Sequence, residues 1–202
     1  MNLARSVVGA LLERTPEPLP PAQPFAGPGV YALYYHGPFE PYQPVSSPEC
    51  RTPIYVGKAI APGGRKGRGA DAAGEGMPLF QWLPEQPKSA EAMPLFQRLC
   101  EHAKSLEQAE NLALADFRCR YLVVMPVWVT LAEQFLLSHY RPIWNSLVDG
   151  FGNHDPGSGR SAMRRQRWDI LHPGRPWAAR LTAAESPTEV LTAVAEFFES
   201  GG

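Results

Sequence analysis

The sequence predicts an α+β fold in which a small three-stranded antiparallel sheet is flanked by helices, with long loop insertions and terminal helices. Three short segments are rich in aromatic and β-branched residues, as strands are: 29–36, 54–57 and 117–125. Apolar residues recur at helical spacing in four others: 3–14, 94–109, 130–140 and 187–200. The 18 glycines and 22 prolines among 202 residues predict long loops between these elements.

Length and composition fit one intracellular domain over residues 1–202, because 44% hydrophobic residues are enough for a single core. Charged residues make up only 19%, which argues against a coiled coil, and the net charge of −1 gives no sign of a nucleic-acid partner. The three cysteines form no Cys-x-x-Cys pair, and no apolar run reaches 18 residues. We therefore expect a cytoplasmic protein without a membrane segment.

The first half of the chain alternates between elements and proline-rich segments. An amphipathic helix is predicted at 3–14, and the six prolines of 15–28 indicate an extended connector, since proline suits neither a helix interior nor a central strand. The strand at 29–36 (GVYALYYH) is followed by a proline-rich loop at 37–53 and then by the second strand.

In the second half, a basic, glycine-rich loop at 62–69 precedes a helix that begins at Pro94, a residue accepted in a first helical turn. The third strand alternates along its length, with Arg118 and Arg120 turned outward. Past the helix at 130–140, the stretch from Pro142 to about Arg180 shows no periodicity. The closing acidic helix has one apolar face: Val190, Leu191, Val194, Phe197 and Phe198.

Two strand ends carry a tyrosine beside a glycine, in Gly29-Val30-Tyr31 and Tyr55-Val56-Gly57. Cross-strand neighbours in an antiparallel pair lie about 4.5–5.5 Å apart at Cβ, so Tyr31 and Tyr55 are candidates for one shared site. The alternative is that both rings only pack in the core.

The helix at 94–109 places His102 on its apolar face, with Arg98 one turn earlier. An inward-facing arginine needs an anion, because an unpaired buried cation is costly. The anion is either an internal carboxylate, with His102 a satisfied core histidine, or a bound phosphate.

Glu133 and Asn145 also allow two interpretations. Glu133 lies three residues after Thr130, a spacing that fits a capping box as well as a catalytic carboxylate. Asn145 directly follows a helix, in Arg141-Pro142-Ile143-Trp144-Asn145, where it is either a turn residue or a site residue.

Taken in order, these residues resemble the GIY-YIG nuclease family over about residues 29–145. The features that match are GVY at 29–31, YVGKA at 55–59, Arg98, His102, Glu133 and Asn145. Val30 and Val56 replace the usual isoleucines, which is a conservative change in a strand.

The histidine one turn beyond the arginine, and the segments 150–160 and 168–175, resemble the type II restriction-endonuclease branch that cuts the SacII-type palindrome CCGCGG. The resemblance implies the GIY-YIG fold, with a catalytic core at about 29–145. It also implies an N-terminal arm at 1–28 and a loop-rich DNA-binding extension with a closing helix at 146–202.

The residue types suit phosphodiester hydrolysis, which needs a charge clamp, an activated water and help for the leaving oxygen. Arg98 would clamp the scissile phosphate, and Glu133 would hold one Mg²⁺ per active site together with phosphate oxygens and water. We assign water activation to Tyr31 and His102, with the division between them open. Tyr55 would orient water or phosphate, and the resemblance implies that Asn145 orients Glu133 or the phosphate.

Local charge favours double-stranded DNA as the substrate. Ten of the 19 basic residues fall in two short windows, 58–68 and 160–180. Asp169 is the sole acidic residue of the second basic window. Contacts with DNA are predicted for eight residues: Lys58, Arg65, Lys66, Arg68, Arg160, Arg164, Arg165 and Arg175.

The expected function is therefore that of a type II restriction endonuclease that cuts both strands of a palindromic site with Mg²⁺. A homodimer, formed in solution or on DNA, is expected because one chain has one catalytic centre and a duplex has two strands. The alternatives are a structure-specific repair or mobile-element nuclease, and a DNA-binding module on the same fold that has lost catalysis.

Overall fold

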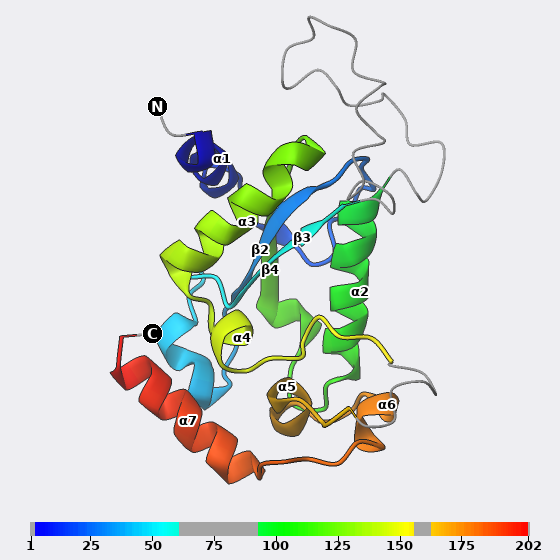
Figure 1. The fold of residues 1–202 in the computed structure, drawn as a ribbon, viewed down its shortest axis with the longest axis vertical. Coiled ribbons are helices and arrows are strands. Elements are labelled where there is room, and N and C mark those ends of the chain that lie inside the picture. The colour runs from blue at the N-terminus through cyan, green and yellow to red at the C-terminus, as the bar shows by residue number, and fades with distance from the viewer. Residues whose placement is uncertain (1–2, 61–92, 156–162, 202) are drawn as a thin grey trace, which may run out of the picture.

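The computed structural model describes residues 3–60, 93–155 and 163–201. A four-stranded antiparallel sheet of order β1-β4-β2-β3 lies between helices, with α1 and α3 on one face and α2 on the other (Figure 1). The strands are β1 (Glu17–Pro18), β2 (Gly29–Tyr35), β3 (Tyr55–Ala59) and β4 (Phe117–Val123). The longer helices are α1 (Leu3–Leu12), α2 (Pro94–Gln108), α3 (Pro126–Tyr140) and α7 (Pro187–Glu199).

The mixed α and β composition agrees with the prediction, but the predicted number of strands is wrong by one. The three expected strands are present, and the additional strand, β1, lies in the connector that was expected to be merely extended. Glu17 pairs with Cys119 and Pro18 with Arg118 at the sheet edge. An edge strand tolerates proline because one side of it donates nothing to the ladder.

Strand β2 is buried along its whole length because it has helices on both faces. Tyr31 and Leu33 pack toward α2, whereas Val30, Ala32 and Tyr34 pack toward α1 and α3. This alternation is what a pleated strand produces when both faces of the sheet are covered. Arg120 of β4 was expected to point outward, and this prediction is wrong. Its side chain lies over the Tyr34 ring and donates to two backbone carbonyls, because this face of the sheet is covered by helices.

Helix α3 begins at Pro126, four residues before the predicted start, because proline is favoured at the first helical position. Thr130 therefore lies inside the helix, and the capping box predicted for Thr130 and Glu133 is wrong. The helix ends where Arg141 adopts the left-handed conformation (φ 44°) ahead of Pro142. In the part of the chain that the structure describes, the helices are all too short or too polar to cross a bilayer.

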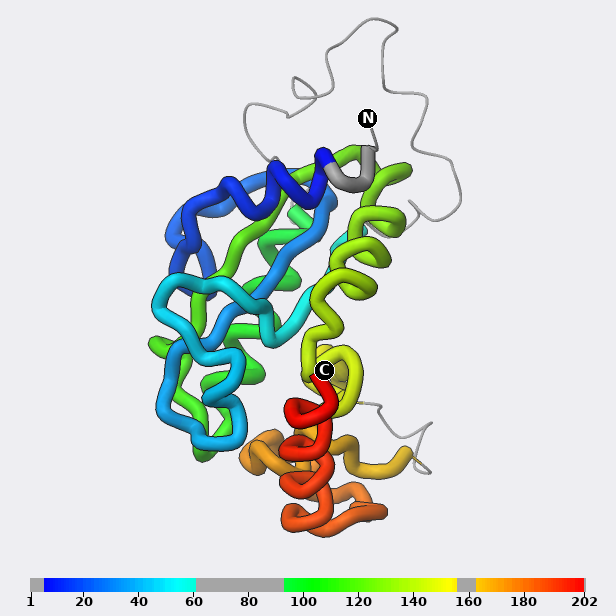
Figure 2. The backbone as a smooth tube through the Cα atoms, turned by 90° about the vertical axis from the view of Figure 1, so that its left-hand side faces the viewer, coloured from blue at the N-terminus to red at the C-terminus, as the bar shows by residue number. Residues whose placement is uncertain are grey.

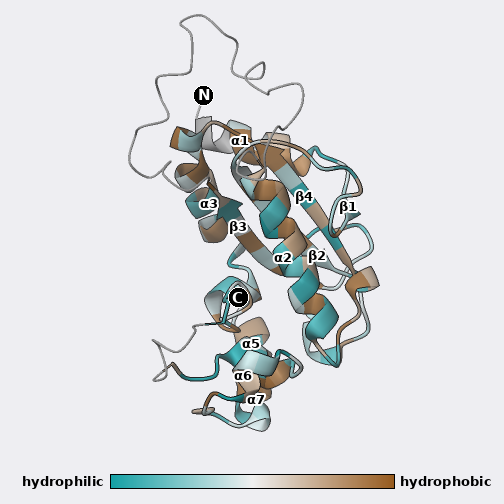
Figure 3. Cartoon of the chain, turned by 90° about the vertical axis from the view of Figure 1, so that its right-hand side faces the viewer, coloured by the Kyte–Doolittle hydropathy of each residue, from teal (hydrophilic) through white to brown (hydrophobic). Residues whose placement is uncertain are grey.

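The stretch from Pro142 to Arg180 is less irregular than its sequence indicates. Its described residues, 142–155 and 163–180, contain three helical turns that are too short to show periodicity: α4 (Ile143–Ser146), α5 (Arg167–Leu171) and α6 (Pro176–Ala179). Together with α7 they gather at one end of the sheet, away from α1 (Figures 2 and 3). Val190 and Val194 of α7 are buried as predicted, but Leu191 is 37% exposed and does not belong to the packed face.

Arg175 holds this C-terminal part together. Its side chain is 2% exposed, and its Nε donates to Asp169 Oδ1 at 2.6 Å. Its terminal nitrogens donate to three carbonyls of one loop, those of Gly150, Phe151 and Asn153. The guanidinium also lies over the Trp168 ring, 4.3 Å from its centroid. The structure does not support the DNA contact predicted for Arg175, because the side chain is 2% exposed and four of its five N–H groups are directed at protein acceptors.

His172 docks the C-terminal part onto the short 3₁₀ helix η1 (Glu40–Val45) inside the predicted loop 37–53. Its Nε2 lies 2.7 Å from Tyr42 Oη, and its Nδ1 lies 2.9 Å from Asn111 Oδ1. The amide oxygen can only accept, so Nδ1 carries the proton and Nε2 accepts from Tyr42. Burial lowers the pKa of His172 to about 3, which keeps this imidazole neutral.

The depressed pKa of His172 predicts that the protein loses stability as the pH falls. The unfolded chain takes up a proton near pH 6.5 and the folded chain does not, so this stabilisation is complete above about pH 6.5. As the pH falls from about 6.5 toward 3, the free energy of unfolding decreases by up to about 1.4 kcal/mol per pH unit. Urea unfolding between about pH 7 and about pH 5 measures this slope.

His172→Gln should flatten the slope, whereas His139→Gln, at an exposed position of α3, should leave it unchanged. Equal slopes in the wild type and in His172→Gln would contradict the assignment.

Candidate active site

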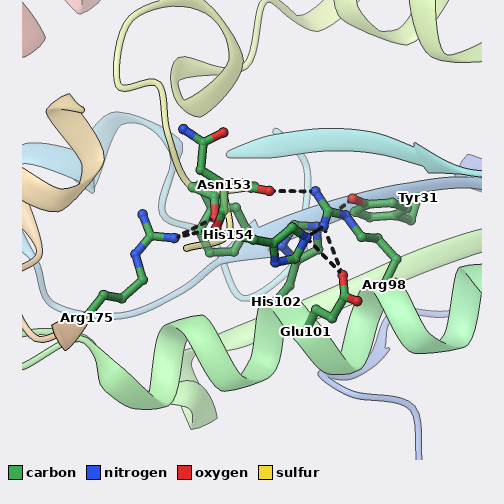
Figure 4. A network of polar contacts seen from close by, with 9 residues as sticks. Tyr31, Arg98, Glu101, His102, Asn153, His154 and Arg175 are labelled. Carbon is green, nitrogen blue, oxygen red and sulfur yellow. Dashed lines mark hydrogen bonds and ion pairs between the residues drawn. The ribbon is translucent and has the colours of Figure 1, made fainter. Parts of the chain in front are cut away.

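The candidate site lies where β2, β3 and α2 meet, under the loop 149–154 (Figure 4). Its centre is a buried pair from β2 and α2, in which the Tyr31 hydroxyl oxygen is 2.5 Å from His102 Nε2. Both side chains are only 1% exposed. The Phe151 ring of the loop stacks on the imidazole, with centroids 4.5 Å apart and planes 14° from parallel.

The register of β2 and β3 explains why a glycine stands at position 57, opposite Tyr31. Tyr31 pairs with Gly57, and Tyr55 pairs with Leu33 two residues along β2. A Cβ at position 57 would collide with the Tyr31 hydroxyl, so only glycine lets that ring lie across β3. The centroids of the Tyr31 and Tyr55 rings lie 6.2 Å apart, so the predicted proximity of the two side chains is confirmed.

Burial sets the charge state of the central pair. It raises the pKa of Tyr31 well above its ordinary value, and the Tyr55 phenol adds to this while the Arg98 guanidinium opposes it. Burial, followed by the positive charge of Arg98, holds the pKa of His102 well below its ordinary range. Both groups are therefore neutral near pH 7, and a single proton lies along the Tyr31–His102 contact.

Arg98 has the internal carboxylate partner that one of the two interpretations requires, and the phosphate of the other interpretation stays a prediction. Its Nη1 donates to Glu101 Oε2 at 2.9 Å, so it has an internal carboxylate partner one turn along α2. The same guanidinium acts on both tyrosines, since it lowers the pKa of Tyr31 and of Tyr55 against the effect of burial. Arg98 thus reaches the tyrosine pair while it is anchored from the other side.

Glu133 projects from the middle of α3 toward β3. Its Oε2 lies 2.7 Å from Lys58 Nζ, and its negative charge raises the pKa of Tyr55 after the larger effect of burial. The structure thus brings Lys58, which was predicted to contact DNA, to the carboxylate predicted to hold a metal.

The donor set around Glu133 fits Mg²⁺. Within residues 3–60, 93–155 and 163–201, clusters of three or more metal-ligating side chains are absent. Mg²⁺ characteristically takes one or two carboxylates and completes its shell with water and substrate phosphate oxygens. Among the described residues, Glu133 would be the one protein ligand, and water and substrate oxygens would supply the others.

Asn145 belongs to the site in a way that differs from the prediction. Its side-chain amide accepts from the Val56 N–H at 2.8 Å and donates to the Val56 carbonyl at 2.9 Å. Both polar ends of the amide are therefore used on the backbone of β3, between Tyr55 and Gly57. Asn145 fixes that strand, and its predicted action on Glu133 or on a phosphate stays a prediction.

The other six predicted DNA-contacting residues, beside Lys58 and Arg175, have three different outcomes. Arg164 is exposed, whereas Arg165 donates to the carbonyls of Ala178 and Ala179 and so satisfies the end of α6. Four lie outside the described residues: Arg65, Lys66, Arg68 and Arg160.

The second basic window is also less positive than its sequence indicates. Arg167 forms a two-fold contact with Glu185, and Arg180 pairs with Asp155. Both carboxylates come from outside the window, so counting charges along the sequence could not find them.

Four residues of the site were given no catalytic role from the sequence: Glu101, Phe151, Gly152 and His154. The Gly152 carbonyl accepts from Arg98 Nη2 at 2.8 Å, and a Cβ there would approach both Arg98 and the Tyr55 hydroxyl. Glu101 had a signal, since an acidic residue three positions after an arginine lies beside it on a helix. The other three come from a loop whose position depends on Arg175, and this dependence leaves no local pattern.

A comparison with protein families matches residues 23–198 of the chain to the family described as the Eco29kI GIY-YIG domain. A comparison with curated proteins finds no match. The matched range covers β2, β3, β4, α2, α3, α4 and the loop 149–154, which together carry every residue of the site described above. The chain therefore belongs to the Eco29kI GIY-YIG family of restriction-endonuclease domains.

Proposed function

We propose that this protein is a type II restriction endonuclease that uses Mg²⁺ to hydrolyse both strands of double-stranded DNA at a palindromic site, CCGCGG by resemblance. The observation that carries the proposal is the Tyr31–His102 contact, which lies beside the guanidinium of Arg98. Family membership supports a DNA nuclease, and this geometry supplies the chemistry that a nuclease needs.

The scissile phosphate enters a cleft of about 340 Å³ between the end of β3 and the start of α2. Lys58 lines one side of this cleft, and Arg98 and Glu101 line the other. Two cations on opposite walls match the two nonbridging oxygens of a phosphodiester, which share one negative charge, and the additional negative charge that develops in the transition state. Arg98 keeps its charge at any pH at which the protein is folded.

Water is activated by Tyr31 and His102 acting in series. The neutral imidazole of His102 accepts the Tyr31 proton through Nε2, while the Tyr31 oxygen accepts a proton from the attacking water. Arg98 favours this step because its charge stabilises a developing phenolate. The buried position of the pair keeps other water away from the proton that moves.

When bound at Glu133, Mg²⁺ supplies Lewis-acid stabilisation of the phosphate and of the leaving oxygen. Lys58 holds the Glu133 carboxylate in place, and Asn145 holds the strand that carries Tyr55 and Lys58. Two chains per duplex would place one such centre on each strand, in keeping with the two-fold symmetry of a palindrome.

The proposal is tested by incubating the purified protein with a plasmid that carries one CCGCGG site, with and without Mg²⁺. We expect one linear product that requires Mg²⁺, and a complex with Ca²⁺ and cognate duplex that contains two chains. Random nicking would indicate a repair-type or mobile-element nuclease, and binding without cleavage would indicate a non-catalytic module.

Glu133→Gln should abolish cleavage and leave the fold intact. Glu133 lies inside α3 and caps nothing, so glutamine should cost little stability. Loss of a metal ligand should slow cleavage roughly a hundredfold or more, since the metal contributes several kcal/mol to the transition state. Cleavage rates at saturating protein measure the effect, with Glu196→Gln, at an exposed position of α7, as the control. A Glu133→Gln protein that cleaves at the wild-type rate would refute the metal assignment.

Tyr31→Phe should remove catalysis, whereas Tyr42→Phe should not. The two tyrosines are a matched pair, because each is fully buried and each contacts the Nε2 of a buried histidine. Both changes should cost about 1–2 kcal/mol of stability through the lost hydrogen bond. The loss of a general base should in addition slow cleavage by Tyr31→Phe by about 10²–10⁴. Equal cleavage by the two folded variants would contradict the role of Tyr31.

A further inference from the structure

Two side chains around Arg98, those of Glu101 and His154, have no role in the mechanism described so far. We propose that they are positioning residues, which hold the Arg98 guanidinium in the orientation that meets the scissile phosphate. The inference rests on the proposed nuclease function and adds the means by which its phosphate clamp is aligned.

The geometry that supports this role is a three-sided grip on one guanidinium (Figure 4). Arg98 Nη1 donates to Glu101 Oε2 at 2.9 Å and to His154 Nε2 at 2.7 Å. Arg98 Nη2 donates to the Gly152 carbonyl at 2.8 Å. Because a guanidinium is planar and its donors have fixed directions, three acceptors determine the plane of the group. The two N–H groups that these acceptors do not use remain for the neighbouring tyrosines and for the scissile phosphate.

The grip comes from two separate parts of the chain. Glu101 is on α2, in the cleft that Lys58 and Arg98 also line, whereas Gly152 and His154 come from the loop held by Arg175. A hydrogen-bond partner on one element alone would leave the long arginine side chain free to rotate. Partners on two different elements restrict this rotation before DNA binds, which is the preorganisation that a transition-state clamp requires.

The two side chains should differ in their effect on DNA affinity. Glu101 brings a negative charge to the cleft, so it repels the DNA backbone while it aligns Arg98. His154 accepts a hydrogen bond from Arg98 through Nε2, which requires the neutral imidazole, and it therefore adds no charge. Removal of either hydrogen-bond partner should slow cleavage, but only the removal of the Glu101 charge should tighten binding.

Their exposure indicates that neither side chain is needed for the core. The Glu101 side chain is 46% exposed and that of His154 is 64% exposed, whereas the Arg98 side chain is 23% exposed. Variants at both positions should therefore fold, and changes in rate can be assigned to the alignment of Arg98.

The test compares Glu101→Gln, His154→Ala and His154→Gln with the wild type, in single-turnover cleavage with Mg²⁺ and in DNA binding with Ca²⁺. We expect Glu101→Gln to cleave about tenfold more slowly, because its neutral amide oxygen accepts from Arg98 Nη1 more weakly than the carboxylate does. We also expect it to bind DNA several-fold more tightly, because a negative charge is removed from the cleft. The control is Glu107→Gln, which makes the same charge change at an exposed position further along α2 and should alter neither quantity by more than about twofold. His154→Ala should lose a similar rate with unchanged binding, and His154→Gln should recover most of it because its amide oxygen can accept from Nη1.

Wild-type rates in Glu101→Gln and His154→Ala would overturn the inference, as would a failure of His154→Gln to recover the rate in a folded protein. Solvent exchange of the Arg98 guanidinium protons, followed by NMR without DNA, gives a second readout that does not depend on cleavage. Exchange should be slow in the wild type and faster in both variants, and equal exchange would contradict the grip. If the wild type failed to cleave any DNA, the proposed function would fall, and the exchange measurement would still decide whether Glu101 and His154 hold Arg98.

Discussion

The burial of Arg175 is the constraint on which the rest of the structure depends. A buried guanidinium without partners would cost several kcal/mol, so the chain has to bring Asp169 and three backbone carbonyls around it. Those carbonyls belong to the loop 149–154, which also stacks Phe151 on His102 and presents the Gly152 carbonyl to Arg98. The C-terminal part of the chain therefore completes a site whose catalytic residues all lie before residue 146.

Most of the fold could be predicted because its main elements have local signals. The strands β2, β3 and β4 and the helices α1, α2 and α7 all appear near their predicted bounds, since apolar periodicity and proline position are properties of short segments. Strand β1 and the turns α4, α5 and α6 could not be predicted, because elements of two to five residues are too short to show a period. Their existence depends on tertiary partners such as β4 and Arg175.

The centre of the candidate site was predictable, but the use of its surroundings was not. Tyr31, Tyr55, Arg98 and His102 converge as expected, because strand register and helical spacing fix their relative positions. Charge alone was a poor guide to the rest, since a sequence window does not show which carboxylate or carbonyl an arginine will meet. Arg175 and Arg165 were expected to contact DNA for this reason, and Asn145 was expected to act on Glu133, whereas all three stabilise backbone.

The most direct measurement of this coupling is the titration of His102 in the wild type and in Arg175→Lys, followed by NMR of the imidazole. Lysine keeps the positive charge that disfavours the imidazolium but cannot hold three carbonyls and a carboxylate in one plane. The account predicts that the pKa of His102 lies far below 6.5 in the wild type, and that it rises toward its ordinary value in folded Arg175→Lys as Phe151 loosens and water enters. An identical pKa of His102 in the two folded proteins would show that the loop does not depend on Arg175, and would contradict the account.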